Sequence, residues 1–379
     1  MQYLRLSALV CSTTLALSAC SSIAAAPEDV VYGVDDRVEV YETTSNVHRA
    51  IAESAVAMQV ASALLDASNP ADVQIHSMST VGADDMLCAG ERFADQPDPG
   101  DCSGTLIDTR HILTAGHCVS RCSANESWVL GYRYVSAGTL ATLTSDDVYR
   151  CASIVTRRVT GSSGDYAVIA LDREVVGHTP AVVDRTHPLP VGTSLTLIGH
   201  PEGMPMKIAG GAHVVTASTA TFTATVDAFA GNSGSGAFDD SGHVVGILDS
   251  GNDDYVMNGS CFVVNVIDES SGQGESLTAI DTAMTAFCAT ADGAASPVCA
   301  GVVTDGGTPG SDAGTRTIDG GAVIDGGAVI DGGVIDGGGS PTPSSGGCGC
   351  MLARPRSHGL ASASIAGLAL ALVARRRRR

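Results

Sequence analysis

Short segments rich in apolar and β-branched residues, separated by Gly, Asn and Asp, recur along the middle of the chain. Residues 30–42 alternate apolar and polar side chains, which predicts a strand with one buried face. Residues 46–67 instead place Ala, Val, Ile, Met and Leu at helical spacing, which predicts a helix. Because later apolar segments such as 164–171 and 191–209 are short and bounded by turn-forming residues, we expect an all-β protein with a helix near its N-terminus.

The first 20 residues have the pattern of an export leader. Arg5 precedes an apolar centre, and the stretch ends in Leu-Ser-Ala-Cys at Cys20. This ending resembles the lipobox of bacterial lipoproteins, which implies that Cys20 is lipidated and attaches the protein to a membrane. The alternative is an ordinary signal peptide, cleaved near residues 24–26, so that Cys20 is discarded. Residues 21–85 then belong in part to the folded domain or form a removable prosegment.

The composition changes sharply after Cys299. Residues 300–347 consist largely of Gly, Asp, Pro, Ser and Thr, with a near-repeat of Ile-Asp-Gly-Gly. Such a segment buries too little apolar surface to fold alone, so we expect a disordered linker. Calcium-binding glycine–aspartate repeats would need a longer period than this repeat has, so calcium is not expected here.

Residues 348–379 combine a Cys-Gly-Cys motif (Cys348 and Cys350), an apolar run over 359–374 and a terminal block of arginines. This pattern resembles the C-terminal sorting tails of myxobacterial surface proteins, which implies processing and attachment at the cell surface. The alternative is a plain tail anchor whose arginines stay in the cytoplasm. Both place the folded domain outside the cytoplasm, so we expect an exported protein at the cell envelope or surface, or released from it.

Charge and cysteine content narrow the possible partners. The formal net charge is −20 at pH 7, which disfavours nucleic acid as a partner. Eight of the twelve cysteines lie between residues 88 and 299, and an even number in an exported chain predicts disulfides. Cys118 and Cys122 have a spacing found in zinc sites, but no second pair completes such a site. We therefore expect neither a metal nor another cofactor.

Three motifs carry candidate chemistry in a fixed order. They are Thr-Ala-Gly-His-Cys at 114–118, Gly-Asp-Tyr-Ala-Val-Ile-Ala-Leu at 164–171 and Gly-Asn-Ser-Gly-Ser-Gly at 231–236. The order His, Asp, Ser resembles the trypsin-like serine peptidases, and Gly-Asn-Ser-Gly-Ser resembles their bacterial branch, which includes the glutamyl endopeptidases. The resemblance covers residues 31–288. It implies a chymotrypsin-like fold of two six-stranded antiparallel β-barrels with a short C-terminal helix, and a peptidase domain over 86–299.

The chemistry requires a base beside the hydroxyl, because a serine is a weak nucleophile at neutral pH. The resemblance assigns Ser233 as the nucleophile, His117 as the general base and Asp165 as the carboxylate that orients the imidazole. Asp146 and Asp147 are alternatives for the acid, but no apolar strand follows them. The backbone amides of Gly231 and Ser233 are the expected oxyanion-hole donors.

The resemblance has further implications for the first barrel and for activation. Cys102-Ser-Gly-Thr-Leu-Ile resembles a family strand whose cysteine is bonded to the one after the catalytic histidine, which implies a Cys102–Cys118 disulfide. Asn232 stands where the animal enzymes have an aspartate that pairs with a newly freed N-terminal amine. Because an amide cannot form that ion pair, we do not expect activation by this salt bridge. His200, next to a proline, is interpreted as a structural turn residue.

The specificity pocket is the least constrained part of the site. Asp227 occupies the position that in trypsin lies at the floor of the pocket and selects Lys or Arg, but it is equally compatible with a structural role. Ser250 and Gly251 would form the pocket wall. The family usually has Ser-Trp-Gly at 249–251, so Asp249 is a departure that places an extra carboxylate near the triad.

The sequence therefore predicts a secreted or surface-anchored serine endopeptidase that cleaves proteins or peptides through an acyl-enzyme. The alternative is a weakly active or inactive protease-like protein that serves as a surface binding module. An esterase of the Gly-x-Ser-x-Gly type is disfavoured, because in those enzymes the serine precedes the histidine in the chain and Ser235 replaces their second glycine.

Overall fold

A computed structural model describes residues 31–300 of the chain. The expected leader with Cys20, residues 301–347 of the linker and the tail over 348–379 lie outside the described residues. Among residues 31–300, no helix is both long enough and apolar enough to cross a membrane.

The first of two large β-sheets curls back on itself. Its strand order is β11-β8-β3-β6-β7-β13-β12. The two edge strands, β11 and β12, are separated in the chain only by Arg150, so one continuous stretch supplies both edges of the sheet. The strands are β3 (Val56–Ala61), β6 (Gly100–Leu106), β7 (His111–Thr114), β8 (Glu126–Leu130), β11 (Val148–Tyr149), β12 (Cys151–Thr160) and β13 (Gly164–Leu171).

The second sheet closes into a barrel. Six strands pair in the order β19-β18-β15-β16-β17-β23, and β23 pairs back to β19. The short strand β14 adds to β19 in parallel, and β2 adds to β16. The strands are β2 (Arg37–Glu39), β14 (Val182–Val183), β15 (Ser194–Gly199), β16 (Lys207–Ala217), β17 (Thr221–Ala224), β18 (Gly236–Phe238), β19 (His243–Ser250) and β23 (Glu275–Ala279).

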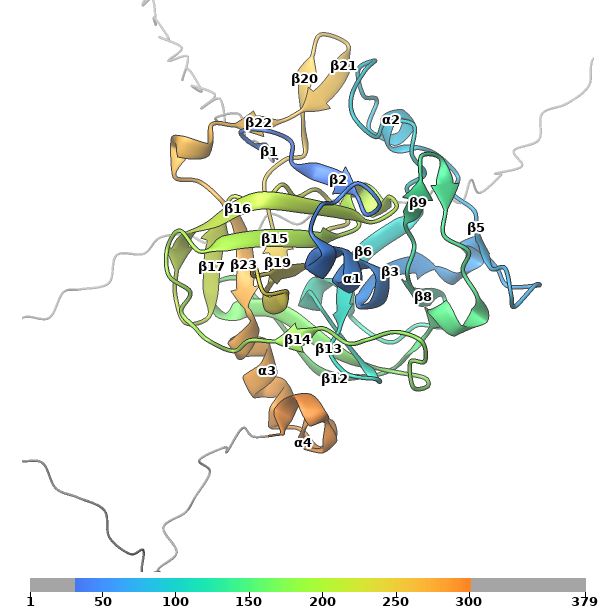
Figure 1. The fold of residues 1–379 in the computed structure, drawn as a ribbon, viewed down its shortest axis with the longest axis vertical. Helices are drawn as coiled ribbons and strands as arrows, with labels where there is room; N and C mark the ends of the chain where they lie inside the picture. Colours follow the sequence, from blue (N-terminus) through green and yellow to red (C-terminus); the bar gives the residue numbers. More distant parts are fainter. Residues whose placement is uncertain (1–30, 301–379) are drawn as a thin grey trace, which may run out of the picture. The chain divides into compact units, whose positions relative to one another are not determined.

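Small two-stranded sheets and short helices complete the described chain (Figure 1). The small sheets pair β1 (Val31–Tyr32) with β22 (Val266–Ile267), β4 (Leu65–Asp66) with β5 (Gln74–Ile75), β9 (Tyr134–Ser136) with β10 (Thr139–Leu140), and β20 (Tyr255–Asn258) with β21 (Cys261–Val264). The α-helices are α1 (Asn46–Ser54), α2 (Val81–Asp84), α3 (Ile280–Cys288) and α4 (Ala291–Ala295). The 3₁₀ helices are η1 (Ser62–Leu64), η2 (Gly116–Cys118), η3 (Ser145–Asp147), η4 (Gly161–Ser163), η5 (Pro201–Gly203), η6 (Glu269–Ser271) and η7 (Pro297–Cys299).

The all-β, two-barrel class expected from the sequence is confirmed, with a helix on either side of the barrels in chain order. The helix expected over 46–67 is wrong in its length. The helix α1 begins after Ser45, whose hydroxyl accepts a hydrogen bond from the His48 amide, and it ends at Ser54. The next residues form β3, which pairs with β6 on one side and β8 on the other. Ladder pairing on both sides outweighs helical spacing there.

The two barrels share one buried cluster. Leu113 of β7 and Val168 of β13 come from the first sheet, and Ile198 of β15 and Ile247 of β19 come from the second. Phe287 of α3 completes this set with its side chain fully buried. Packing of this kind fixes one sheet against the other, so loops that leave facing strand ends are held at a defined separation.

The N-terminal segment, residues 31–39, packs on the second barrel. Its strand β2 pairs with β16, and β1 pairs in parallel with β22. Arg37 in this segment is buried; its guanidinium lies 2.8 Å from Asp35 Oδ2 and 3.8 Å from the centre of the Phe229 ring. A buried cation that has both a carboxylate and an aromatic partner is well compensated, so this segment is an integral part of the folded unit.

Candidate active site

The loop that carries His117 is shaped by the glycine before it. Ala115 links β7 to η2, and a Cβ on Gly116 would lie 2.6 Å from Asp165 Oδ1 and would also collide with the Arg158 carbonyl oxygen. Only glycine allows β13 to approach this closely. Asp165 Oδ1 accepts the His117 amide at 3.0 Å, and His117 Nδ1 lies 2.8 Å from Asp165 Oδ2. Asp165 therefore holds the backbone and the imidazole of His117 together.

This pairing fixes the tautomer of His117. A carboxylate accepts but does not donate, so Nδ1 carries the proton and Nε2 is left as the basic nitrogen. The side chain of His117 is 35% exposed, and that of Asp165 is 15% exposed. The carboxylate is thus shielded from solvent while the imidazole is accessible, and a general base must be within reach of the group whose proton it takes.

Asp147, one of the two alternative acids, has other partners. Its carboxylate accepts from the amide and hydroxyl of Thr144 at the start of η3 and contacts His178 Nε2 at 2.7 Å. These hydrogen bonds hold the pKa of Asp147 below its usual value, against the opposing effect of burial. Asp147 therefore stabilises a turn on the first barrel and is committed to His178.

Ser233 lies beside the residue that follows His117. Its carbonyl oxygen accepts the Ser103 amide at 2.9 Å and is 3.5 Å from Cys118 Sγ. The next residue, Gly234, has φ +86°, and a Cβ there would be 2.8 Å from the Ala115 amide. The serine loop therefore packs against the end of β7 and the start of the histidine loop, so the three motifs found far apart in sequence meet at one place.

The loop that precedes Ser233 is also tightly packed. Gly231 has φ +85°, and a Cβ there would lie 2.6 Å from the His200 carbonyl oxygen and 3.0 Å from the Glu202 amide. The Gly231 carbonyl accepts from the Ser103 hydroxyl at 2.8 Å, and that hydroxyl in turn accepts the His200 amide at 2.9 Å. Asn232 is buried, and its Oδ1 accepts the Ser235 hydroxyl at 3.1 Å. Asn232 thus stabilises the loop with a neutral hydrogen bond.

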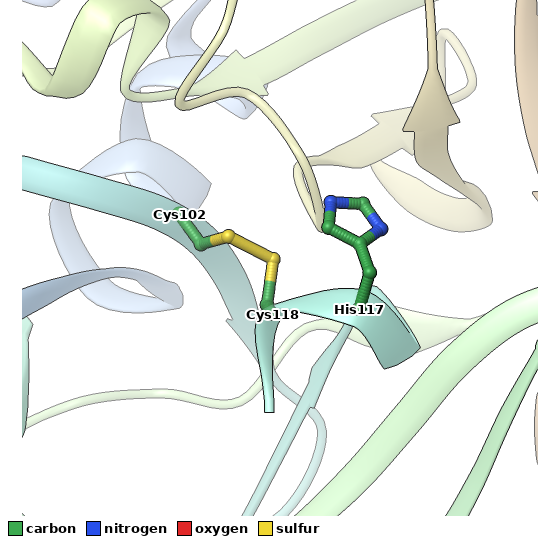
Figure 2. Close-up of side chains that lie close together, drawn as sticks. All are labelled: Cys102, His117 and Cys118. Atoms are coloured by element: carbon green, nitrogen blue, oxygen red, sulfur yellow. A yellow bond between two sulfur atoms is a disulfide. The ribbon is translucent and has the colours of Figure 1, made fainter. Parts of the chain in front are cut away.

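Disulfides cross-link the strands and loops around the candidate site. Cys102 of β6 is bonded to Cys118, directly after His117, and Figure 2 shows this bond beside the imidazole. The other cysteines of the described chain form the bridges Cys88–Cys261, Cys122–Cys151 and Cys288–Cys299. Because Cys118 and Cys122 are bonded to different partners, neither offers a thiolate to zinc.

In the described part of the chain, Asp184, Asp239 and His243 bring their side-chain oxygen and nitrogen atoms within 4.8 Å of one another. Asp184 Oδ1 accepts the Thr186 amide, and Asp239 Oδ1 accepts the His243 amide, as carboxylates in turns commonly do. These residues shape turns on the second barrel.

Asp227, the candidate pocket floor, is buried, and both of its carboxylate oxygens accept hydrogen bonds. Its Oδ1 accepts the Tyr32 amide at 2.9 Å, and its Oδ2 accepts the Asp36 amide at 2.7 Å. Burial nevertheless raises the pKa of Asp227 to about 7, which the two backbone hydrogen bonds only partly oppose. The carboxylate is therefore an anchor for the N-terminal segment in this structure.

The candidate pocket wall packs against another buried acid. Ser250 and Gly251 are exposed at the end of β19, and a Cβ on Gly251 would collide with Glu275 Oε2. Glu275 accepts the Tyr32 hydroxyl at 2.9 Å and the Asn252 amide at 3.1 Å. Burial raises the pKa of Glu275 to about 8. Tyr32 therefore lies between two carboxylates, Asp227 and Glu275.

Three residues that organise the site were not predicted from the sequence: Ser103, Thr278 and Glu275. Ser103 bridges three segments with its hydroxyl and amide, and its only signal in the sequence was its place directly after Cys102 in the strand motif. The Thr278 hydroxyl, on the opposite barrel, accepts a hydrogen bond of 2.8 Å from the Asp165 amide.

His200, interpreted as a turn residue, is buried, and its Nδ1 contacts the Met204 carbonyl at 2.9 Å. Burial lowers the pKa of His200 to about 3, so its imidazole is neutral.

The central part of the chain matches a known protein family. A family model described as a trypsin-like peptidase domain matches residues 102–247. No curated protein matches the chain. Among solved structures, the chain is similar to a Glu endopeptidase in complex with MPD, with 20% identity and a TM-score of 0.37 over 64% of this chain and 95% of that chain.

Two further solved structures are similar at low identity. The VesB protease of Vibrio cholerae has 15% identity and a TM-score of 0.39 over 67% of this chain and 65% of that chain. Neuropsin, a serine protease of mouse brain, has 18% identity and a TM-score of 0.36 over 48% of this chain and 86% of that chain. The family match supports a peptidase of the trypsin-like serine class.

Proposed function

We propose that the protein is a serine endopeptidase that cleaves peptide bonds through His117, Asp165 and Ser233. The observation that carries the proposal is the His117–Asp165 pair, with Nδ1 and Oδ2 2.8 Å apart, together with the approach of the Ser233 carbonyl oxygen to within 3.5 Å of Sγ of Cys118, the residue after His117. An imidazole held by a carboxylate on one nitrogen and open on the other suits proton transfer from a neighbouring hydroxyl.

The proposed reaction proceeds in two acyl-transfer steps. In the first, Nε2 of His117 takes the proton of Ser233 as its Oγ attacks the peptide carbonyl carbon, and the resulting imidazolium then protonates the leaving amine. In the second, His117 activates water, which releases the acid product and restores Ser233. The amides of Gly231 and Ser233 would donate to the oxyanion, and loss of one such donor typically costs about 3 kcal/mol of transition-state stabilisation.

The test compares the full chain with Ser233→Ala and His117→Ala on casein. Loss of hydrolysis by at least about a thousandfold in both variants is expected from the interdependence of triad residues. A fluorophosphonate probe should label the unmodified protein at Ser233 and fail to label His117→Ala. Equal casein hydrolysis by Ser233→Ala would refute the assignment and favour a binding protein built on a peptidase fold.

We also propose that the protein is exported and attached to the cell envelope, through a lipidated Cys20 or through the tail over 348–379. The four disulfides support the export part, because such bonds persist in oxidising compartments. The packing of residues 31–39 on the second barrel supports their retention after processing. Intact mass of the mature protein tests all three points. A mature chain that starts after residue 39 would contradict retention, and a mass without lipid and with an intact tail would contradict lipidation and tail processing.

A further inference from the structure

A second carboxylate lies behind the proposed triad acid, on the other barrel. Asp249, near the end of β19, is 7% exposed, and its Oδ2 accepts the Thr278 hydroxyl at 2.7 Å. The oxygen of the same hydroxyl accepts the Asp165 amide at 2.8 Å. A continuous hydrogen-bonded chain therefore runs from His117 through Asp165 and Thr278 to Asp249.

The backbone of β19 is irregular where Asp249 sits. Leu248 pairs with Leu277 and Ser250 pairs with Ser276, so Asp249 is an extra residue opposite the β23 ladder. A bulge of this kind turns a side chain out of the normal alternation, and bulges are frequent beside active sites. It explains how the Asp249 side chain reaches Thr278 while neighbouring Leu248 remains in the barrel core.

The proton of Thr278 has a preferred direction. A threonine hydroxyl donates one hydrogen bond, and the Asp249 carboxylate at 2.7 Å is a nearer and stronger acceptor than the Asp165 carbonyl at 3.4 Å. With its proton committed to Asp249, the Thr278 oxygen presents lone pairs to the Asp165 amide. Thr278 is fully buried, and water is therefore a poor competitor for either bond.

The fit at the other end of the chain is equally close. Gly164, just before Asp165, has φ +94°, and a Cβ there would lie 3.0 Å from Thr278 Cγ2. The two barrels are thus in contact at the residue that orients His117. Asp165 is held from both sides, since its carboxylate binds the histidine loop and its amide binds the second barrel.

The groups that face Asp249 are few. Asp165 of β13 is the charged one, and Thr278, Ser276 and Ser250 donate hydrogen bonds from β23 and β19. Burial and the charge of Asp165 raise the pKa of Asp249, and the three hydroxyl groups oppose this shift. The extra carboxylate is joined through Thr278 to Asp165, the proposed partner of the imidazolium that forms during catalysis.

We infer that Asp249 is a positioning residue for the proposed peptidase reaction, acting through Thr278 to fix Asp165 and so His117. The inference rests on the proposed function. Asp249 touches neither substrate nor the reacting atoms; its carboxylate orients the Thr278 hydroxyl, and the hydroxyl orients the triad acid. We therefore expect the hydrogen bond between Thr278 of the second barrel and Asp165 to contribute to kcat, with little effect on substrate binding.

The test uses the full chain and a peptide substrate selected from a library. Thr278→Val should lower kcat about tenfold, the equivalent of one lost charge-assisted hydrogen bond, with KM changed less than about twofold. Thr278→Ser, which keeps the hydroxyl, should restore most of the rate. Asp249→Asn should lower kcat by about fivefold, because the amide is a weaker acceptor than the carboxylate. Asp240→Asn, an exposed acid in the turn before β19, is the matched control and should leave kcat unchanged.

Two further measurements separate positioning from general stability. Asp249→Asn combined with Thr278→Val should be no slower than Thr278→Val alone, since both break one chain. The acidic limb of the kcat/KM profile should move to lower pH in Asp249→Asn, because a negative charge that favours the imidazolium is removed. Thermal unfolding midpoints report whether each variant is folded, and Asp249→Asn carries the test if Thr278→Val does not fold.

The outcomes distinguish this inference from the proposed function. Suppose that fluorophosphonate labels the unmodified protein. If Asp249→Asn and Thr278→Val then both keep kcat within about twofold of the unmodified value, and Asp249→Asn leaves the pH of the acidic limb unchanged, Asp249 has no positioning role. Multiplicative effects in the double variant would also overturn it. If the unmodified protein is neither labelled nor active on casein, the peptidase assignment itself fails.

Discussion

The backbone amide of Tyr32 donates a hydrogen bond of 2.9 Å to Oδ1 of Asp227, which lies 195 positions later in the chain. The second oxygen of this carboxylate is occupied by the Asp36 amide. In trypsin, the residue at this position selects basic side chains, and there it must face the pocket. Here both oxygens of Asp227 face the N-terminal segment. A structural role for Asp227 is therefore better supported than the selection of Lys or Arg.

The first prediction concerns Asp227→Ser. The buried Tyr32 amide and the partly buried Asp36 amide lose a charged acceptor, so the free energy of unfolding should fall by about 3 kcal/mol. The relative cleavage rates after Lys, Glu and Phe should stay within about twofold of those of the unmodified protein. Urea unfolding and a peptide library measure the two effects. Asp240→Ser, an exposed change, should alter neither quantity. A selective loss of cleavage after Lys and Arg would instead show that Asp227 lies in the pocket.

The second prediction concerns alkaline pH. Burial raises the pKa of Glu275 to about 8, so the folded state binds this proton more tightly than the unfolded state does. The stabilisation is therefore present below the ordinary pKa of a glutamate and is lost as the pH rises through about 8. Between pH 7 and 9 this group should reduce the free energy of unfolding by about 1.4 kcal/mol.

Urea unfolding at several pH values checks this effect, with Glu275→Gln as the variant. The slope of stability against pH between 7 and 9 should become shallower in Glu275→Gln, whereas Glu174→Gln should keep the original slope. An unchanged slope in Glu275→Gln would show that Glu275 does not titrate in this range. The comparison concerns the slope, because loss of an acceptor for the Asn252 amide also lowers the overall stability of the variant.

The third prediction separates two disulfides of the first barrel. Replacing Cys102 and Cys118 together by alanine should lower the free energy of unfolding by about 3 kcal/mol in the chain-entropy account. It should also lower kcat about tenfold or more, because the bond holds the residue next to His117. Replacing Cys122 and Cys151 should cost similar stability but keep kcat within about threefold. Casein hydrolysis and urea unfolding test both pairs, and equal kcat in the two double variants would refute the role of the first bond.

Several features of the fold were predictable because they depend on local sequence. Alternating apolar residues specify strands whichever partner they find, and Ser45 caps α1 with its own hydroxyl. The error at residues 56–61 has a clear cause. Their composition permits both states, and the pairing of β3 with β6 and β8 decides between them, which no local pattern records.

The candidate site likewise has features that follow from the sequence and features that depend on the tertiary structure. The sequence by itself determined the residue types and their order, since a histidine, a carboxylate and a serine at glycine-rich turns point to acyl transfer wherever they meet. Only the tertiary structure decided the environment of each group: that Asp227 faces Tyr32, that Glu275 lies behind Gly251, and that Thr278 links Asp249 to Asp165. The reason is physical. Hydrogen bonds and burial depend on distances between residues remote in the chain, and those distances are fixed by how two barrels pack.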